Sequence, residues 1–154
     1  MTTPSGKLDN ADESKLPLPA LFAQGKEVTV GQLHRRLAEE GFDGILYWHG
    51  SVFRFIDAEG SRLTVLAERS GLTKQAIGEV VSDLERHGYV ERTADPDDRR
   101  AKIIRLTDRG IKGQAAAARI LGEIEQRWAK HLGRERVAAL RQTLAEVIRL
   151  EKGQ

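Results

Sequence analysis

The segment over residues 64–110 carries the pattern that most limits how this chain can fold. Residues 64–70 have the apolar spacing of a short helix, and a tight turn that contains Gly71 follows them. Thr73 then stands where an N-terminal cap belongs, ahead of a predicted helix over residues 74–87. A short helix, a glycine-containing turn and a second helix together predict a helix-turn-helix.

Two short strands are predicted directly after this unit, over residues 89–92 and 102–106. Between them, Asp95-Pro-Asp-Asp98 is strong turn material. A hairpin that follows a helix-turn-helix makes a winged helix. The expected fold class is therefore mainly α with a small antiparallel β-wing.

The tip of this wing concentrates charged side chains. Arg99 and Arg100, with Lys102 beside them, can reach phosphates or a neighbouring minor groove, whose negative potential favours arginine. Asp98 is expected to pair with Arg100 and to hold this long side chain outward. We interpret these charges as serving a partner rather than the fold. The alternative is a solvated turn whose charges protect an exposed strand edge.

The helix over residues 74–87 has two distinct faces when its positions are placed about 100° apart. The side expected to face a core carries Ile77, Val80, Val81 and Leu84. The opposite side carries Gln75, Glu79, Ser82 and Arg86, flanked by Lys74 and Gly78. In a major groove, Gln can bind adenine and Glu can accept from the cytosine amino group. The alternatives are an ordinary solvated face and, for the glycine, close packing against the preceding helix.

Helices are predicted over most of the remaining chain. Residues 1–16 are polar and are expected to form a flexible tail, and residues 17–154 form one domain. Further helices are predicted over residues 18–40, 43–57, 108–131 and 134–151. Their apolar stripes comprise Ile111, Ala115, Ala118, Leu121, Ile124 and Trp128 in the long helix, and Val137, Leu140, Leu144 and Ile148 in the last one.

Composition and charge limit the classes of function. The 154 residues hold 25 Lys and Arg against 23 Asp and Glu, so a case for nucleic acid depends on where the charges lie. Cysteine is absent and the histidines show no ligand spacing, so we expect no metal site. We find no catalytic grouping or phosphate-binding glycine loop, so we expect neither an enzyme nor a cofactor. Without a signal-peptide layout or a membrane-spanning segment, we expect a cytoplasmic protein.

The segment over residues 66–110 resembles the MarR family of bacterial transcription regulators along its whole length. The family's wing pattern D-x-R-x5-L-T is matched in full by Asp98, Arg100, Leu106 and Thr107. The resemblance implies a winged-helix homodimer that binds a pseudo-palindromic operator, usually as a repressor relieved by a small molecule. It implies DNA contacts by Thr73, Lys74, Gln75, Gly78, Glu79, Ser82, Arg99, Arg100 and Lys102, with Asp98 orienting the wing. Many relatives carry a basic residue in place of Glu79, so no operator sequence is carried over.

We expect the winged-helix lobe over residues 61–110. The helices on either side of it fit the family's dimerisation lobe. That lobe would comprise residues 17–42 and 111–154. Two-fold symmetry would place the recognition helices about 34 Å apart, one turn of DNA. The alternative is a monomer with ordinary core helices.

Five of the eight aromatic residues lie within residues 42–55. The resemblance implies a small phenolic or anionic effector bound between the two lobes, near this segment. The candidate effector pocket comprises Tyr47, Trp48, His49, Phe53 and Arg54, because aromatic walls with one cation suit an aromatic acid. The alternative is that these aromatic residues simply fill the core at the junction.

We therefore expect a sequence-specific DNA-binding regulator whose partners are double-stranded DNA, a second copy of the chain and a small effector. The alternative is a winged-helix protein-interaction module without specific DNA binding, which binds its partner through the aromatic segment. Salt separates the two, because binding through phosphate contacts weakens steeply with salt and binding through an apolar interface does not.

Overall fold

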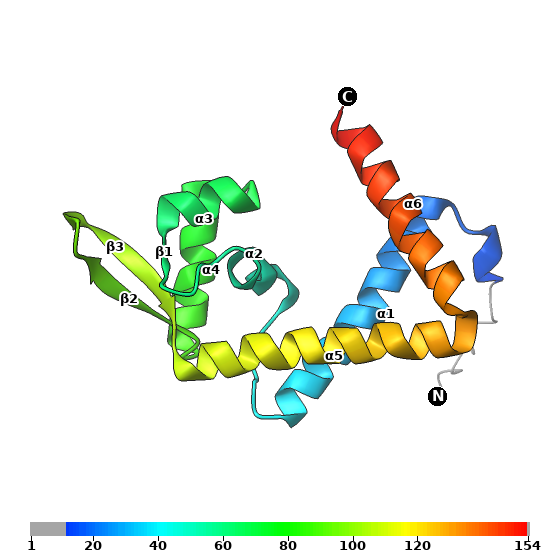
Figure 1. The fold of residues 1–154 in the computed structure, drawn as a ribbon, viewed down its shortest axis with the longest axis horizontal. Coiled ribbons are helices and arrows are strands. Elements are labelled where there is room, and N and C mark those ends of the chain that lie inside the picture. Colours follow the sequence, from blue (N-terminus) through cyan, green and yellow to red (C-terminus); the bar gives the residue numbers. More distant parts are fainter. Residues whose placement is uncertain (1–11, 154) are drawn as a thin grey trace, which may run out of the picture.

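A computed structural model of the chain describes residues 12–153, which are mainly helical and carry one small sheet at one end (Figure 1). The helices are α1 (Leu18–Glu39), α2 (Gly50–Phe53), α3 (Leu63–Ser70), α4 (Lys74–Arg86), α5 (Asp108–Leu132) and α6 (Arg134–Lys152); the strands are β1 (Ser61–Arg62), β2 (Val90–Asp95) and β3 (Asp98–Leu106). The expected class, mainly α with a small antiparallel β-wing, is confirmed. None of the described helices combines the length and the apolarity needed to cross a membrane.

The segment before α1 is described only in part. Most of the tail expected over residues 1–16 lies outside the described residues, and Glu13–Lys15 forms the short 3-10 helix η1. The α1 helix then continues unbroken through Gly25 and Gly31. A Cβ added at either glycine would meet nothing within 4 Å, so both lie on an open side of the helix.

The turn between α3 and α4 has the end residues that its sequence predicts, whereas α3 begins one residue earlier than predicted, at Leu63. Gly71 ends α3 in the left-handed conformation, with φ of 71°. Thr73 caps α4, because its hydroxyl oxygen accepts a hydrogen bond from the Ala76 N–H at 3.1 Å. The inward side of α4 buries Ile77, Val81 and Leu84 completely. This burial fixes which side of α4 faces outward.

The wing is a three-stranded antiparallel sheet in the order β1-β3-β2. The β2 and β3 strands reach farther toward the tip than predicted, because pairing continues until Asp95 lies opposite Asp98. The sequence does not predict β1, in which Ser61 and Arg62 pair with β3, since two residues show no alternating pattern. The hairpin projects beside α4, at one end of α5 (Figure 1).

The helix predicted over residues 43–57 is wrong in its extent. This segment forms only the 3-10 helix η2 (Tyr47–His49) and the single turn α2 (Gly50–Phe53). Gly44 has φ of 81°, a left-handed conformation that interrupts a helix, and a side chain there would clash with the His87 ring. Apolar spacing does not report this close approach, because the histidine belongs to a distant segment.

The α5 helix carries apolar residues on more than one face, and the predicted stripe selects the wrong one. The buried positions are Gly110, Gly113, Ala116, Ile120 and Ile124. In the predicted stripe Ile124 is buried and Trp128 is half-buried, but the exposed positions are Ile111, Ala115, Ala118 and Leu121. Four consecutive alanines over residues 115–118 make every face similarly apolar, so spacing alone does not orient the helix.

The α6 helix contributes no buried residue to the core of the single chain. The sequence predicts buried Leu140 and Ile148, yet they are 49% and 52% exposed. Val137 and Leu144 are half-buried against α5. The α6 helix lies at the end of α5 that is far from the wing (Figure 1). Its apolar side is therefore open to solvent in one chain.

Candidate nucleic-acid interface

The outward face of α4 is open over its whole length. The exposed side chains on it are Lys74, Gln75, Glu79, Ser82 and Arg86, on the side that their angular positions predict. A hollow of about 610 Å³ lies along this face and is lined by Gln75, Gly78, Glu79, Ser82, Glu85, Arg86 and Arg92. Arg92 comes from β2, whereas the other lining residues belong to α4. The hollow is thus bounded by the helix on one side and by the base of the wing on the other.

Gly78 is not required by the packing of α4 on α3. A Cβ at this position would meet only Leu63 Cδ2, at an ordinary van der Waals distance of 3.8 Å. The core therefore has room for alanine, although glycine costs a helix about 1 kcal/mol relative to alanine. Close packing against the preceding helix is thus not the reason for this glycine. The remaining reason lies on the outer surface of α4, where the missing side chain lets another molecule approach the helix more closely.

Arg92 joins the wing to α4 from the β2 side. Its guanidinium donates a hydrogen bond of 2.9 Å to the Ser82 hydroxyl and lies 3.6 Å from the Glu85 carboxylate. These contacts hold the base of the hairpin against the outward face of the helix. Sequence reasoning missed Arg92, because the strand pattern shows only that it belongs to the hairpin and not what it faces.

The turn at the tip of the wing is shaped by Asp98. Its carboxylate accepts a hydrogen bond of 2.9 Å from the backbone N–H of Arg100. The expected pairing with the guanidinium of Arg100 is therefore replaced by a backbone contact that stabilises the turn. Arg99, Arg100 and Lys102 are all exposed.

The tip end of β2 is tied to β1 by Asp95, which sequence reasoning also missed. Its buried carboxylate accepts a hydrogen bond of 2.6 Å from Arg62 on β1 and one of 2.9 Å from the Asp97 N–H. The Asp97 N–H is the largest cause that lowers the pKa of Asp95, and Arg62 adds to it against the opposing effect of burial. The carboxylate therefore stays ionised and fixes the hairpin to β1.

The residues expected to form an effector pocket have different surroundings. Tyr47 and Trp48 are about half exposed, whereas His49 is fully buried. Phe53 packs edge-on against Tyr89, and the Arg54 guanidinium donates to the Gly50 carbonyl oxygen of its own helix. Tyr47, Trp48 and Arg54 thus offer free surface, and the histidine and the phenylalanine serve the fold.

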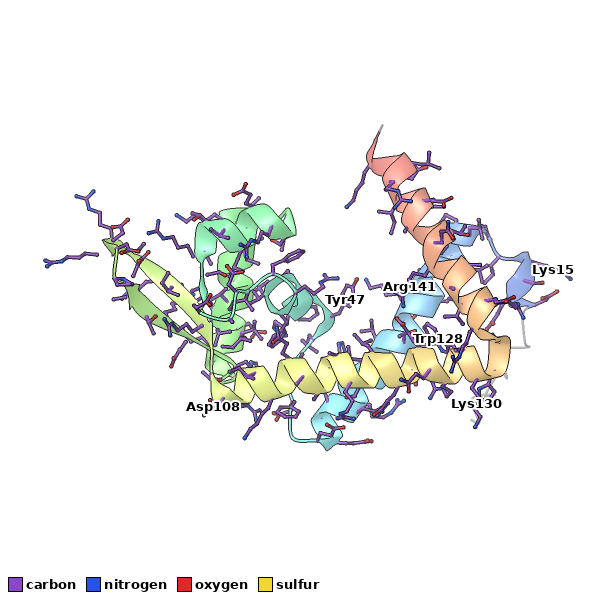
Figure 2. The ribbon with its side chains drawn as sticks, viewed as in Figure 1. Lys15, Tyr47, Asp108, Trp128, Lys130 and Arg141 are labelled. Carbon is purple, nitrogen blue, oxygen red and sulfur yellow. The ribbon has the colours of Figure 1, made fainter. Side chains whose placement is uncertain are left out.

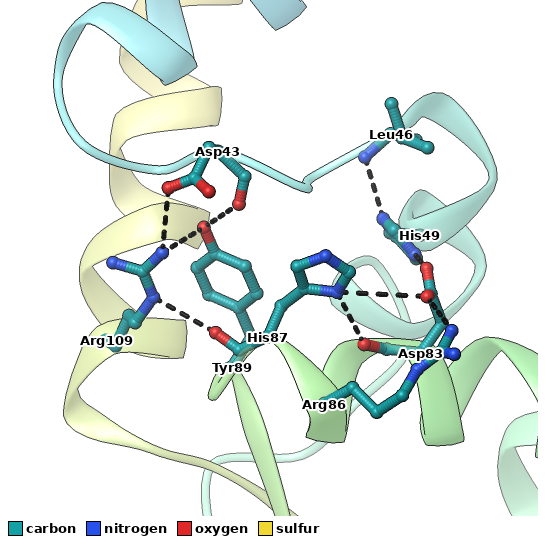
Figure 3. A network of polar contacts seen from close by, with 8 residues as sticks. All are labelled: Asp43, Leu46, His49, Asp83, Arg86, His87, Tyr89 and Arg109. Atoms are coloured by element: carbon teal, nitrogen blue, oxygen red, sulfur yellow. Dashed lines mark hydrogen bonds and ion pairs between the residues drawn. The ribbon is translucent and has the colours of Figure 1, made fainter.

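His49 links the segment before α2 to α4 (Figure 3). Leu46 N–H donates to Nδ1 of His49 at 2.7 Å, so the ring proton lies on Nε2, which donates to Asp83 of α4 at 2.6 Å. Arg86 also donates to this carboxylate. Burial alone would raise the pKa of Asp83, but the hydrogen bonds from His49 and Arg86 outweigh it and lower that pKa. Burial is the largest cause that lowers the pKa of His49, and the contact with Asp83 opposes it.

Arg109, near the start of α5, forms a second network beside the first (Figure 3). Its guanidinium donates to the carbonyl oxygens of Gly41 and His87 at 2.9 and 3.2 Å, and to the Tyr89 hydroxyl at 3.0 Å. The Tyr89 hydroxyl donates in turn to the Asp43 carbonyl oxygen at 2.5 Å. These contacts join α5 to the connection that follows α1 and to the start of β2. The winged-helix lobe is therefore tied to the long helix through polar groups.

A two-helix unit with an open polar face, followed by a hairpin with arginines at its tip, defines a winged helix-turn-helix protein. A family model described as the MarR family matches residues 43–101, which run from the segment before α2 into the wing. The chain is similar to the MarR family over this segment and has the fold of that family's transcriptional regulators.

Known proteins resemble this chain over different lengths. The uncharacterised HTH-type transcriptional regulator YdcH of Bacillus subtilis (strain 168) is 33% identical over 75 residues, which cover 47% of this chain and 51% of that protein. The chain thus spans about half the length of the curated relatives that it matches.

Solved structures match over most of the chain. The transcriptional repressor CouR bound to a 23-mer DNA duplex is 26% identical, with a TM-score of 0.70 over 89% of this chain and 96% of that one. CouR from Rhodococcus jostii RHA1 bound to p-coumaroyl-CoA is 26% identical, with a TM-score of 0.62 over 84% and 90% of the two chains.

Proposed function

We propose that this chain is a sequence-specific DNA-binding transcriptional regulator, a homodimer that represses transcription from a pseudo-palindromic operator until a small effector releases it. The observation that carries the proposal is the open face of α4 beside a wing with unpaired cations. Within residues 12–153, no carboxylate lies within 4.0 Å of the charged groups of Lys74, Arg99, Arg100 and Lys102. Such cations are available to phosphates, whose contacts supply most of the affinity for DNA.

The two parts of this surface have different tasks in the proposal. The N-terminal half of α4 enters the major groove, where Gln75 and Glu79 face base edges and Gly78 permits close approach. Thr73, Lys74 and Ser82 contact the flanking backbone. The wing arginines reach the adjacent phosphates or minor groove, and Asp98 and Asp95 hold the hairpin in the required shape. CouR, which has a similar fold and is bound to a DNA duplex in its structure, supports double-stranded DNA as the partner.

A second copy of the chain is the proposed partner of the open apolar surface. Besides α6, the first half of α1 exposes Leu18, Phe22 and Val28, which are 64%, 43% and 63% accessible. Together they form an apolar surface of the kind that marks protein–protein contacts. A symmetric dimer would cover it and would present two recognition helices to half-sites about 34 Å apart. Light scattering at micromolar concentration should give twice the mass of the chain; a monomer would contradict the symmetric operator.

The proposed effector is a small aromatic anion that binds to α1 beside Tyr47 of η2. A hollow of about 450 Å³ is lined by Ala23, Lys26, Glu27, Val30, Gly31 and His34. The Lys26 ammonium lies 4.4 Å from the ring centroid of Tyr47. Among the described residues, His34 Nε2 is shielded from solvent and has no hydrogen-bond partner. One cation, one polar nitrogen and an aromatic ring suit a ring that bears a carboxylate.

Thermal melting with a panel of aromatic acids tests the effector. Ligand binding to the folded state raises the melting temperature, and the shift grows with the ratio of free ligand to Kd. We expect a shift in the wild-type protein, a reduced shift in Lys26→Met and an unchanged one in Lys130→Met. If none of the acids shifts the wild-type protein, the effector part of the proposal has no support.

Fluorescence anisotropy at two salt concentrations tests the DNA-binding function. The probes are the DNA upstream of the protein's own gene and a scrambled duplex of the same composition. We expect tight binding to the first, weaker binding to the second, and a steep loss with salt because bound phosphates release counterions on association. Binding that is insensitive to salt would favour the protein-interaction module.

Two variants assign this binding to the wing. Arg100→Ala should weaken binding and reduce the salt slope by about one unit, the effect of one lost phosphate contact. The matched control is Lys130→Ala, which removes one exposed positive charge at the end of α5 far from the wing (Figure 2). Equal affinity in all three proteins, on both duplexes, would refute the proposed use of the wing.

A further inference from the structure

Glu79 is an exception among the acidic side chains of α4. Asp83 is held by His49 and Arg86, and Glu85 pairs with Arg92 at 3.6 Å. Within the described part of the chain, no cation lies within 4.0 Å of the Glu79 carboxylate. The side chain is exposed and lines the hollow between α4 and the base of the wing.

An unpaired carboxylate on this surface opposes binding to DNA. It faces the same side as Lys74 and Gln75 and repels the phosphates that the nearby cations attract. Its position nevertheless favours contact with a base. Glu79 lies one helical turn after Gln75 and is adjacent to Gly78, so no bulky neighbour holds this part of the helix away from the groove floor. A carboxylate there therefore lowers affinity for all sequences except those that offer it a hydrogen-bond donor.

The major groove offers few such donors. Guanine presents two acceptors, and thymine presents an acceptor and a methyl group, so both repel or exclude a carboxylate. Adenine presents an amino donor next to the acceptor N7, which opposes the second carboxylate oxygen. Cytosine presents its N4 amino group without an adjacent acceptor on the same base, and is the base that an ionised Glu matches.

We propose that Glu79 is a specificity-determining residue that selects a cytosine in each half-site by accepting a hydrogen bond from its N4 amino group. This inference rests on the proposed function. Gln75, on the same face, is free to contact a neighbouring base pair. The carboxylate thus acts in two ways, as a contact for one base and as a repulsive group toward all the others.

Selection from a pool of random duplexes tests this inference without a known operator. The wild-type protein should enrich sites with an invariant cytosine in each half-site. Glu79→Gln should lose this preference and gain adenine at the same position, because Gln pairs with adenine N6 and N7. Glu79→Ala, which cannot accept a hydrogen bond, should lose cytosine without gaining adenine. Glu68→Gln is the control, since it removes the same charge from an exposed position on α3.

Affinities on single duplexes give the size of the effect. On the enriched site, replacing the cytosine pair by a thymine pair should weaken the wild-type protein on the order of 5- to 150-fold, the range for one good side-chain–base pair. The same replacement should have much less effect on Glu79→Gln. On scrambled DNA, Glu79→Gln should bind more tightly than the wild-type protein, because a repulsive charge is gone.

The outcomes separate this inference from the proposed function. If the wild-type protein enriches a site and both Glu79 variants enrich the same one, Glu79 reads no base and the inference is wrong while the DNA-binding function stands. If the wild-type protein enriches no sequence, the proposed function fails and the inference fails with it. Unchanged melting temperatures of the variants would confirm that altered selection does not result from unfolding.

Discussion

The buried contact between His49 and Asp83 helps to hold α4 in place, and its removal should lower the stability of the protein. His49 is 0% exposed, and its two ring nitrogens serve different partners, Leu46 N–H and the Asp83 carboxylate. Replacing it by alanine removes both hydrogen bonds and leaves a cavity. Asparagine should keep an acceptor near the Leu46 N–H, and glutamine should keep a donor near Asp83. The two substitutions therefore separate the two contacts.

The expected loss follows from the partners that remain. An unsatisfied buried donor costs about 1–3 kcal/mol, and a hydrogen bond to a charged group contributes about 1.5–3 kcal/mol. The Asp83 carboxylate keeps Arg86 as a partner, so the loss of its contact with His49 contributes less to the total destabilisation. We expect the free energy of unfolding to fall by about 3–5 kcal/mol in His49→Ala, out of a total of about 5–15 kcal/mol. His49→Asn and His49→Gln should each lose about 1–3 kcal/mol.

Urea denaturation followed by circular dichroism measures these losses, provided that the slope with denaturant is unchanged. The affinity of the variants for DNA gives a second measurement. His49→Gln, which keeps the contact to α4, should bind DNA better than His49→Asn at equal stability. A loss below about 1 kcal/mol in His49→Ala would refute the argument that this contact holds the helix, because a surface substitution alone costs about half of that.

The same histidine makes stability depend on pH. Burial is the largest cause that lowers the pKa of His49 below its ordinary value of 6.5, and Asp83 opposes it. The unfolded chain therefore binds more protons as the pH falls below that value, so the contribution is complete above it and is lost as the pH falls through the lower, folded pKa. Burial also lowers the pKa of His34, so His34 makes stability depend on pH in the same direction. His87 is the other histidine whose charge acts on His49. His49→Gln should lose less stability than the wild-type protein between about pH 7 and 5; equal losses would assign the dependence to other groups.

Three further substitutions test separate parts of the molecule. Gly78→Ala should raise the free energy of unfolding by up to about 1 kcal/mol, because Leu63 leaves room for a methyl group, yet it should weaken DNA binding; tighter binding would contradict close approach at this residue. Gly110→Ala should destabilise by about 1–3 kcal/mol or more, since its Cβ would overlap the Tyr89 carbonyl oxygen, and a wild-type melting temperature would contradict this packing. Leu140→Glu should give a monomer in light scattering, because it places a charge on the open side of α6, and a persistent dimer would exclude this helix from the interface.

Sequence alone predicts the features that depend on neighbours within one or two turns. Thr73 accepts a hydrogen bond from the N–H group three residues later, so its role as a cap follows from local spacing. The inward side of α4 and the hairpin after it also follow from short repeats of apolar residues. These signals predict the winged helix, its open polar face and the cations at its tip.

Contacts between distant segments are decided only by the tertiary structure. Arg62 and Asp95 lie 33 residues apart, and His49 and Asp83 lie 34 apart, so no local pattern pairs them. The structure likewise decides which side of α5 faces the core, because its alanine-rich middle offers several equivalent stripes. The physical reason is that a hydrophobic stripe specifies a buried face but not its neighbour, whereas a contact to a buried polar group needs two chain segments already brought together. The contact between Arg62 and Asp95 and the contact between His49 and α4 are therefore properties of the folded chain.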